Sequence, residues 1–157
     1  MSAVPSLFAG LRIAVGLSLV GAVLGEWFAL PLLKHAGSTK IGDAVFDEGD
    51  PADGLYFVAE GRVAVDVRLR SQEGHRRIST IGAGSSFGEL ALVDGNSRST
   101  RIVALEPTIC FVLTAESFAE LRRRDPTSAS ELVMAIARSL SARLRSSTAD
   151  VAAFEER

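Results

Sequence analysis

The chain has 157 residues, with 17 Lys and Arg against 19 Asp and Glu and a formal net charge of -2. This length suits one domain with a sizeable core. The charge balance offers no positive field to hold nucleic acid non-specifically, so no nucleic-acid partner is expected. A single cysteine, Cys110, lies in the apolar run ICFVL. It excludes an internal disulfide and a cysteine-based metal site, and we expect it to be a buried small hydrophobe.

Residues 1–33 form an apolar segment that differs in composition from the rest of the chain. The run Ile13–Gly25 carries no charge, and Glu26 follows it directly. An uncharged run of this length is typical of a core helix, a signal-peptide core or an interfacial segment, whereas extension to Leu33 would reach membrane length. We therefore expect an apolar N-terminal helix, and the sequence leaves open whether it associates with a membrane.

The segment Ser6–Trp27 also resembles the helix that follows the cytoplasmic coupling loop in the permease subunits of ABC importers. The matching features are AGLR, Ala9–Arg12, and the Gly, Ala, Val and Leu run that ends at Glu26. This resemblance implies a permease-derived remnant or a membrane anchor, and hence a regulatory fragment of an ABC-type transporter as one alternative function. A complete permease needs several further spans, so this chain is not expected to transport a substrate by itself.

From Lys34 onward, short alternating runs are punctuated by Gly, Asp and Pro, and residues 34–125 are predicted to form one β domain. LYFV (Leu55–Val58) and VAVDV (Val63–Val67) carry the aromatic and β-branched residues typical of strands, while DEGDPADG and AEGR are turn sequences. A polar segment containing Gly follows, and RISTIG then resumes the strand pattern. The sequence therefore predicts a meander of short strands.

The last part of the chain is predicted to be helical. Thr114 is a candidate N-cap for TAESFAELRRR, and Pro126 is a candidate first-turn proline of a helix over residues 126–157. This C-terminal helix is amphipathic, because apolar residues recur every four positions at Leu132, Ile136, Leu140 and Leu144. Such a stripe can pack on the β domain or pair with a second copy, and we expect a homodimer through this helix.

One loop, FGELALVDGNSRST (Phe87–Thr100), places a lone carboxylate and a lone guanidinium among apolar and small residues. A short helical run from Glu89 to Leu92 would present free backbone N–H groups to an anion. Arg98 and the Ser99 hydroxyl would close on that anion, while Glu89 would accept a hydrogen bond from a sugar hydroxyl. The loop therefore predicts a site for a sugar joined to one anionic phosphate. The alternative is an ion pair between Glu89 and Arg98 that ties down the loop.

The region Val45–Leu144 resembles the cyclic nucleotide-binding domain, the β-roll module of catabolite activator regulators, of kinase regulatory subunits and of gated channels. The matching motifs, in order, are EGDPADGLYFVAEGRVAV (Glu48–Val65), FGELAL (Phe87–Leu92) and the pair Arg98 and Ser99. This resemblance implies an α+β, mainly β fold: an eight-stranded jelly-roll with a phosphate-binding cassette, flanked by the apolar N-terminal helix and C-terminal amphipathic helices. It also implies a cyclic nucleotide, cAMP or cGMP, as the ligand, and no cofactor.

The resemblance also assigns roles to individual residues. Glu89 would take the ribose hydroxyl, and Arg98 would hold the cyclic phosphate with Ser99. The cassette is lightly altered, because Ser97 stands where the family usually has Pro. In the catabolite activator group a Thr-Ser pair on the long helix touches adenine, and counting from the shared Pro makes Arg143 the candidate base contact, with a solvated Arg as the alternative. The predicted ligand-binding residues are Phe87, Gly88, Glu89, Leu90, Ala91, Arg98, Ser99 and Thr100, with Arg143 at the base.

No nucleophile paired with a base, metal-ligand cluster or P-loop occurs in the sequence, so we do not expect an enzyme. Nothing after Phe154 is long enough for a helix-turn-helix. The sequence predicts a cytoplasmic regulatory module, membrane-associated if residues 1–33 anchor it, whose C-terminal helix moves when ligand binds. A near-complete switch of this kind needs about 5.5 kcal/mol of differential affinity. A ligand-free structural or dimerisation β-roll is the alternative.

Overall fold

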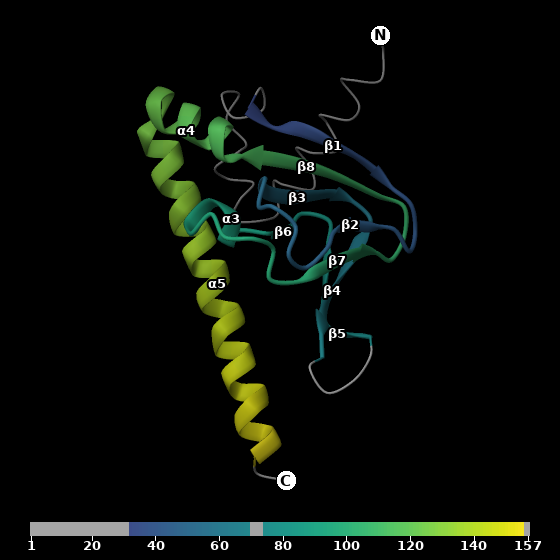
Figure 1. Cartoon of the computed structure of the whole chain (residues 1–157). Helices are drawn as coiled ribbons and strands as arrows, with labels where there is room; N and C mark the ends of the chain where they lie inside the picture. The colour runs from purple at the N-terminus through teal and green to yellow at the C-terminus, as the bar shows by residue number, and fades with distance from the viewer. Residues whose placement is uncertain (1–31, 70–73, 156–157) are drawn as a thin grey trace.

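The computed structural model describes residues 32–69 and 74–155, which form two four-stranded sheets followed by helices (Figure 1). The predicted N-terminal helix, with its permease-like stretch, falls almost entirely on residues 1–31 and so lies outside the described residues. In chain order the elements are β1 (Lys34–Thr39), β2 (Ala44–Phe46), β3 (Gly54–Glu60), β4 (Arg62–Arg68), β5 (His75–Gly82), β6 (Ser86–Phe87), α3 (Leu90–Val93), β7 (Arg101–Ala104), β8 (Thr108–Thr114), α4 (Ala115–Arg124) and α5 (Pro126–Glu155).

The two sheets have the strand orders β1-β8-β3-β6 and β2-β7-β4-β5, and every strand pair is antiparallel. These eight strands with their C-terminal helices confirm the predicted mainly β jelly-roll. The tight turn between β3 and β4 depends on Gly61, which has φ +86° and where a Cβ would lie 2.5 Å from the carbonyl oxygen of Pro107. Glycine is required there for both conformation and space.

Strand β3 lies at the centre of the fold because both of its faces are buried. Leu55 and Phe57 point to a hydrophobic cluster shared with β8, α4 and α5, whereas Tyr56 and Val58 point to a second cluster between the two sheets. Cys110 is buried in this second cluster, as predicted, and burial raises the pKa of its thiol to about 12. Because successive side chains of a strand point to opposite faces, β3 contributes residues to both hydrophobic clusters.

Both C-terminal helices begin where the sequence predicted. The Thr114 side chain accepts a hydrogen bond from the Ser117 backbone N–H at 3.1 Å, and α5 begins at Pro126. The apolar stripe of α5 is buried in the first part of the helix and exposed farther along it: Leu132 is fully buried, whereas Leu144 is 68% exposed. Figure 1 shows α5 passing the sheets and continuing toward the C-terminus. Within the described residues, no helix has the length and apolar character needed to cross a membrane.

Candidate ligand-binding site

The predicted cassette opens onto a cavity of about 770 Å³ that is also lined by β4, β5 and the second half of α5. Most of the predicted residues line this cavity, and Ala91 follows them within α3. The helical turn covers Leu90–Val93 and thus begins one residue later than predicted. The predicted residues that line the cavity are Phe87, Gly88, Glu89, Leu90, Arg98, Ser99, Thr100 and Arg143.

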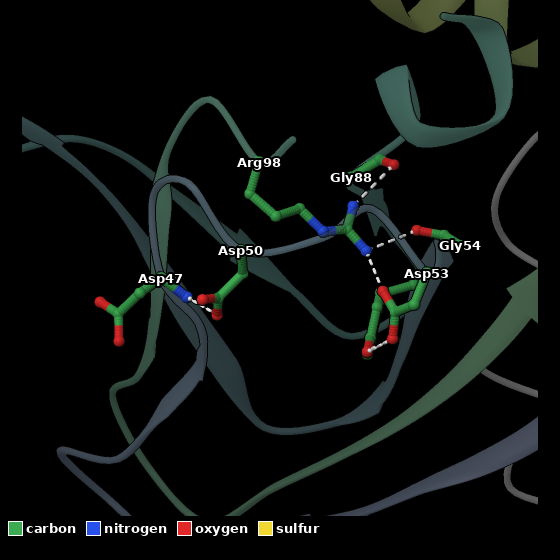
Figure 2. A network of polar contacts seen from close by, with 7 residues as sticks. Asp47, Asp50, Asp53, Gly54, Gly88 and Arg98 are labelled. Carbon is green, nitrogen blue, oxygen red and sulfur yellow. Dashed lines mark hydrogen bonds and ion pairs between the residues drawn. The ribbon is translucent and has the colours of Figure 1, made fainter. Parts of the chain in front are cut away.

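Arg98 brings a positive charge to the cavity, although its side chain is only 3% exposed. Its Nη1 donates to the Gly88 carbonyl at 3.1 Å, and its Nη2 donates to the Gly54 carbonyl at 2.9 Å and to the Asp53 carboxylate (Figure 2). The centroid of the Phe46 ring lies 4.1 Å from Cζ. These contacts fix the guanidinium plane. The buried Nε of Arg98 has no hydrogen-bond partner among the described residues, and the same holds for the Nε of Arg101.

Asp53 is a site residue that the sequence reasoning missed. It accepts hydrogen bonds from Nη2 of Arg98 and from the hydroxyl of Tyr56, the latter at 2.7 Å. Burial, and then the hydrogen bond to Asp53, raises the pKa of Tyr56, so the phenol stays protonated and remains a donor. Asp53 therefore positions Arg98. The turn that contains Asp53, DEGDPADG, has three Asp residues, a residue type common in turns. No sequence pattern distinguishes Asp53 from the other two as the partner of Arg98.

Glu89 is the second charged residue of the cassette and is 4% exposed. Its Oε1 accepts a hydrogen bond from Nη1 of Arg143 at 2.5 Å, and Nη2 of Arg143 donates to the Ser86 carbonyl at 2.7 Å. Because Arg143 belongs to α5, these two bonds join the helix to the cassette. The predicted contact of Arg143 with a base remains a prediction.

The ion pair between Glu89 and Arg98 that the sequence left open does not form. Arg98 pairs with Asp53, and Glu89 pairs with Arg143. Each charge of the cassette thus has its partner outside the loop, in the turn before β3 or on α5. The two charges of the cassette are therefore paired separately instead of neutralising each other.

The family model of the cyclic nucleotide-binding domain matches residues 38–125, which is more than half of the chain. The chain therefore belongs to the cyclic nucleotide-binding domain family.

Two curated relatives illustrate where such domains occur. The chain is 37% identical over 116 residues to the cyclic AMP receptor protein of Thermus thermophilus, a match that covers 73% of this chain and 52% of that protein. It is 36% identical over 126 residues to Glutaminase 2 of Bradyrhizobium diazoefficiens, covering 80% of this chain and 19% of that protein. The chain thus spans about half or less of the length of these relatives.

Solved structures agree with this fold. A cyclic nucleotide-binding domain from Methylobacillus flagellatus superimposes with a TM-score of 0.78 at 24% identity, covering 94% of this chain and 83% of the other. The Thermus thermophilus catabolite activator protein superimposes with a TM-score of 0.72 at 27% identity, covering 90% and 63%. The likeness extends beyond the β-roll, because it covers more of the chain than residues 38–125.

Substitution of Gly88 tests how closely the cassette is fitted to Arg98. Gly88 has φ +74°, and an added Cβ would lie 2.5 Å from Nη1 of Arg98, whereas Gly95 has φ +66° and open space around it. We expect Gly95→Ala to lower the free energy of unfolding by about 1–2 kcal/mol, the cost of a left-handed Ala. Gly88→Ala should cost roughly 1–3 kcal/mol more, because the buried guanidinium loses its bond to the Gly88 carbonyl. Urea denaturation followed by circular dichroism measures both, and equal losses would contradict the fit.

Proposed function

We propose that this domain is a regulatory module that binds a cyclic mononucleotide, cAMP or cGMP, in the cavity and passes the signal on through α5. The observation that carries the proposal is the guanidinium of Arg98, a buried charge among the residues that line the cavity, whose Nε has no hydrogen-bond partner among the described residues. A buried donor without a partner is rare in folded proteins and points to a ligand acceptor. Membership of the cyclic nucleotide-binding domain family supports the class of ligand.

The charge around Arg98 suits a phosphate with a single negative charge. The side chain of its partner Asp53 is 56% exposed, so solvent screens that carboxylate while the guanidinium is buried. An anionic oxygen at Nε would complete the hydrogen bonding of Arg98, and the exposed Ser99 at the cavity wall adds a hydroxyl donor. A charge-assisted hydrogen bond of this kind contributes roughly 1.5–3 kcal/mol.

Glu89 supplies the acceptor for the sugar. An ionised carboxylate accepts hydrogen bonds and donates none, so a ribose 2′-hydroxyl is a suitable partner. One of its oxygens already accepts from Arg143 at 2.5 Å, and the hydroxyl would share or replace this bond. Ligand at Glu89 therefore acts on the contact that joins α5 to the cassette. Ligand binding would shift the position of α5 to the extent that the free energy of this contact differs between the free and bound states.

The proposed role is regulation of a separate effector. The match to Glutaminase 2 covers 19% of that protein, which supports a module that works beside a larger functional unit. A second copy of this chain is the proposed partner of α5 itself. Apolar residues of α5, most of them exposed and Leu140 half-buried against the core, lie in a heptad-like series with spacings of four, three, four and seven, typical of a two-stranded coiled coil. The series is Val133, Ala137, Leu140, Leu144 and Val151, in which Val133, Leu144 and Val151 are 48%, 68% and 60% exposed.

Calorimetric titration of the 157-residue chain with cAMP and cGMP tests the binding proposal. We expect micromolar or tighter binding of at least one ligand, and Arg98→Gln should weaken it at least about tenfold because a charge-assisted bond is lost. Arg101→Gln is the matched control, since Arg101 pairs with Asp47 at 3.0 Å. A folded protein that binds neither ligand, or an Arg98→Gln variant that binds as well as the wild type, would favour a structural β-roll.

Sedimentation analysis tests the proposed dimer. The wild-type chain should sediment as a dimer at micromolar concentration, and Leu144→Glu should sediment as a monomer because it places charges in an apolar seam. Arg145→Glu, a change at the next exposed position of α5, should remain dimeric. A monomeric wild type, or a Leu144→Glu variant with unchanged mass, would refute self-association through this helix.

A further inference from the structure

The wall of the cavity that β5 contributes contains a serine with two arginines shortly before it in the chain. The sequence is Arg76, Arg77, Ile78 and Ser79, and all four residues are exposed and line the cavity. Arginines two and three positions before a serine form the charge pattern that arginine-directed serine kinases recognise, because guanidinium groups bind carboxylates in the substrate groove of such a kinase. The proposed contacts with phosphate and ribose use none of these four residues.

Strand β5 is open to a second protein along one side. It is the last strand of its sheet in the order β2-β7-β4-β5, so β4 is its only strand partner within the described residues. A protein that binds an extended segment, as a kinase does, therefore meets a strand that is already extended. An edge strand also separates from its sheet more easily than a central strand, because it is paired on one side only.

The strand register places the side chain of Ser79 on the cavity side of β5. Ser79 is paired with Val65, and Val65 packs against the hydrophobic cluster between the two sheets. Directly opposed residues of an antiparallel pair share one face of the sheet. Thr80, the next residue, is also exposed and points to the other face. Ser79 and Thr80 are thus neighbouring hydroxyls of which only the first lines the cavity.

A phosphate on Ser79 would change the charge of the cavity. Phosphoserine carries roughly -1.5 to -2 charges at pH 7 and several strong acceptor oxygens. The guanidinium groups of Arg76, Arg98 and Arg143 are among the groups that line the same cavity. The new anion would compete for these donors and would repel an incoming cyclic phosphate. Modification of Ser79 would therefore weaken the binding of an anionic ligand.

We propose that Ser79 is a phosphorylation site through which an arginine-directed serine kinase turns off ligand binding. The hydroxyl oxygen of Ser79 forms a bond to the γ-phosphorus of ATP, and the bond from that phosphorus to the bridging oxygen breaks. ADP leaves with the electrons of the broken bond, and the hydroxyl proton passes to a base of the kinase. The modification is independent of the proposed function, whereas its effect on binding rests on that function.

Incubation of the 157-residue chain with ATP and an arginine-directed serine kinase, followed by peptide mass spectrometry, tests the site. We expect a phosphate on Ser79 that is lost in Ser79→Ala and retained in Thr80→Ala, the matched control on the other face. Arg76→Gln should slow the modification at least about tenfold, because a charge-assisted contact with the kinase is lost. Absence of phosphate from Ser79, or an unchanged rate in Arg76→Gln, overturns the proposed site.

Calorimetric titration of the phosphorylated and unmodified chains with cAMP and cGMP tests the effect on binding. Phosphorylation should weaken binding at least about tenfold, because the added anion opposes the ligand phosphate. Removal of the phosphate by a phosphatase should restore the affinity. Equal affinities of the two forms overturn the regulatory role and leave the proposed function standing. Failure of the unmodified chain to bind either nucleotide overturns both, while the mass spectrum decides the modification separately.

Discussion

The buried guanidinium of Arg98 is the interaction on which the site depends. It bonds to the carbonyl of Gly54 at the start of β3 and to the carbonyl of Gly88 just before α3, so it joins the central strand to the cassette. A buried charge costs several kcal/mol unless it is paired and fully hydrogen-bonded. Its ionic partner Asp53 is more than half exposed, and Nε has no partner in the described part of the chain. The protein therefore leaves the compensation of this charge incomplete within the described residues, and under the proposed function a ligand phosphate would complete it.

Under the proposed function, the ion pair between Glu89 and Arg143 would transmit ligand binding from the cassette to α5. The first turns of this helix are held by buried side chains such as Leu132 and Ile136, whereas Leu144 and the residues beyond it are exposed. Arg143 bonds the exposed half to the cassette. A ligand that engages Glu89 would compete for or share that bond, and the position of the distal helix would respond. In this proposal, the carboxylate of Glu89 would both bind the ligand and change the position of α5.

Local patterns predicted the short strands and the starts of the C-terminal helices, whereas the jelly-roll arrangement was implied by the resemblance to the cyclic nucleotide-binding domain family. Turn sequences alternate with β-branched runs, Thr114 caps α4, and the loop around Glu89 and Arg98 has a recognisable spacing. The ion pairs could not be predicted, because Arg98 is 45 residues from Asp53 and Arg143 is 54 residues from Glu89. Sequence spacing reports neighbours on one element, not partners across the fold. For the same reason, the continuous apolar stripe of α5 did not show at which residue the helix would leave the core and become exposed.

The most direct measurement of the central claim is the Nε–H signal of Arg98 in an arginine-selective proton–nitrogen correlation spectrum, assigned by its loss in Arg98→Lys. Adding saturating cGMP or cAMP should move this resonance strongly downfield and protect it from exchange, because a phosphate oxygen accepts the hydrogen bond that Nε lacks within the described structure. Binding that leaves the Arg98 signal unchanged would contradict the claim, since the ligand would then lie away from the guanidinium around which the cavity is built.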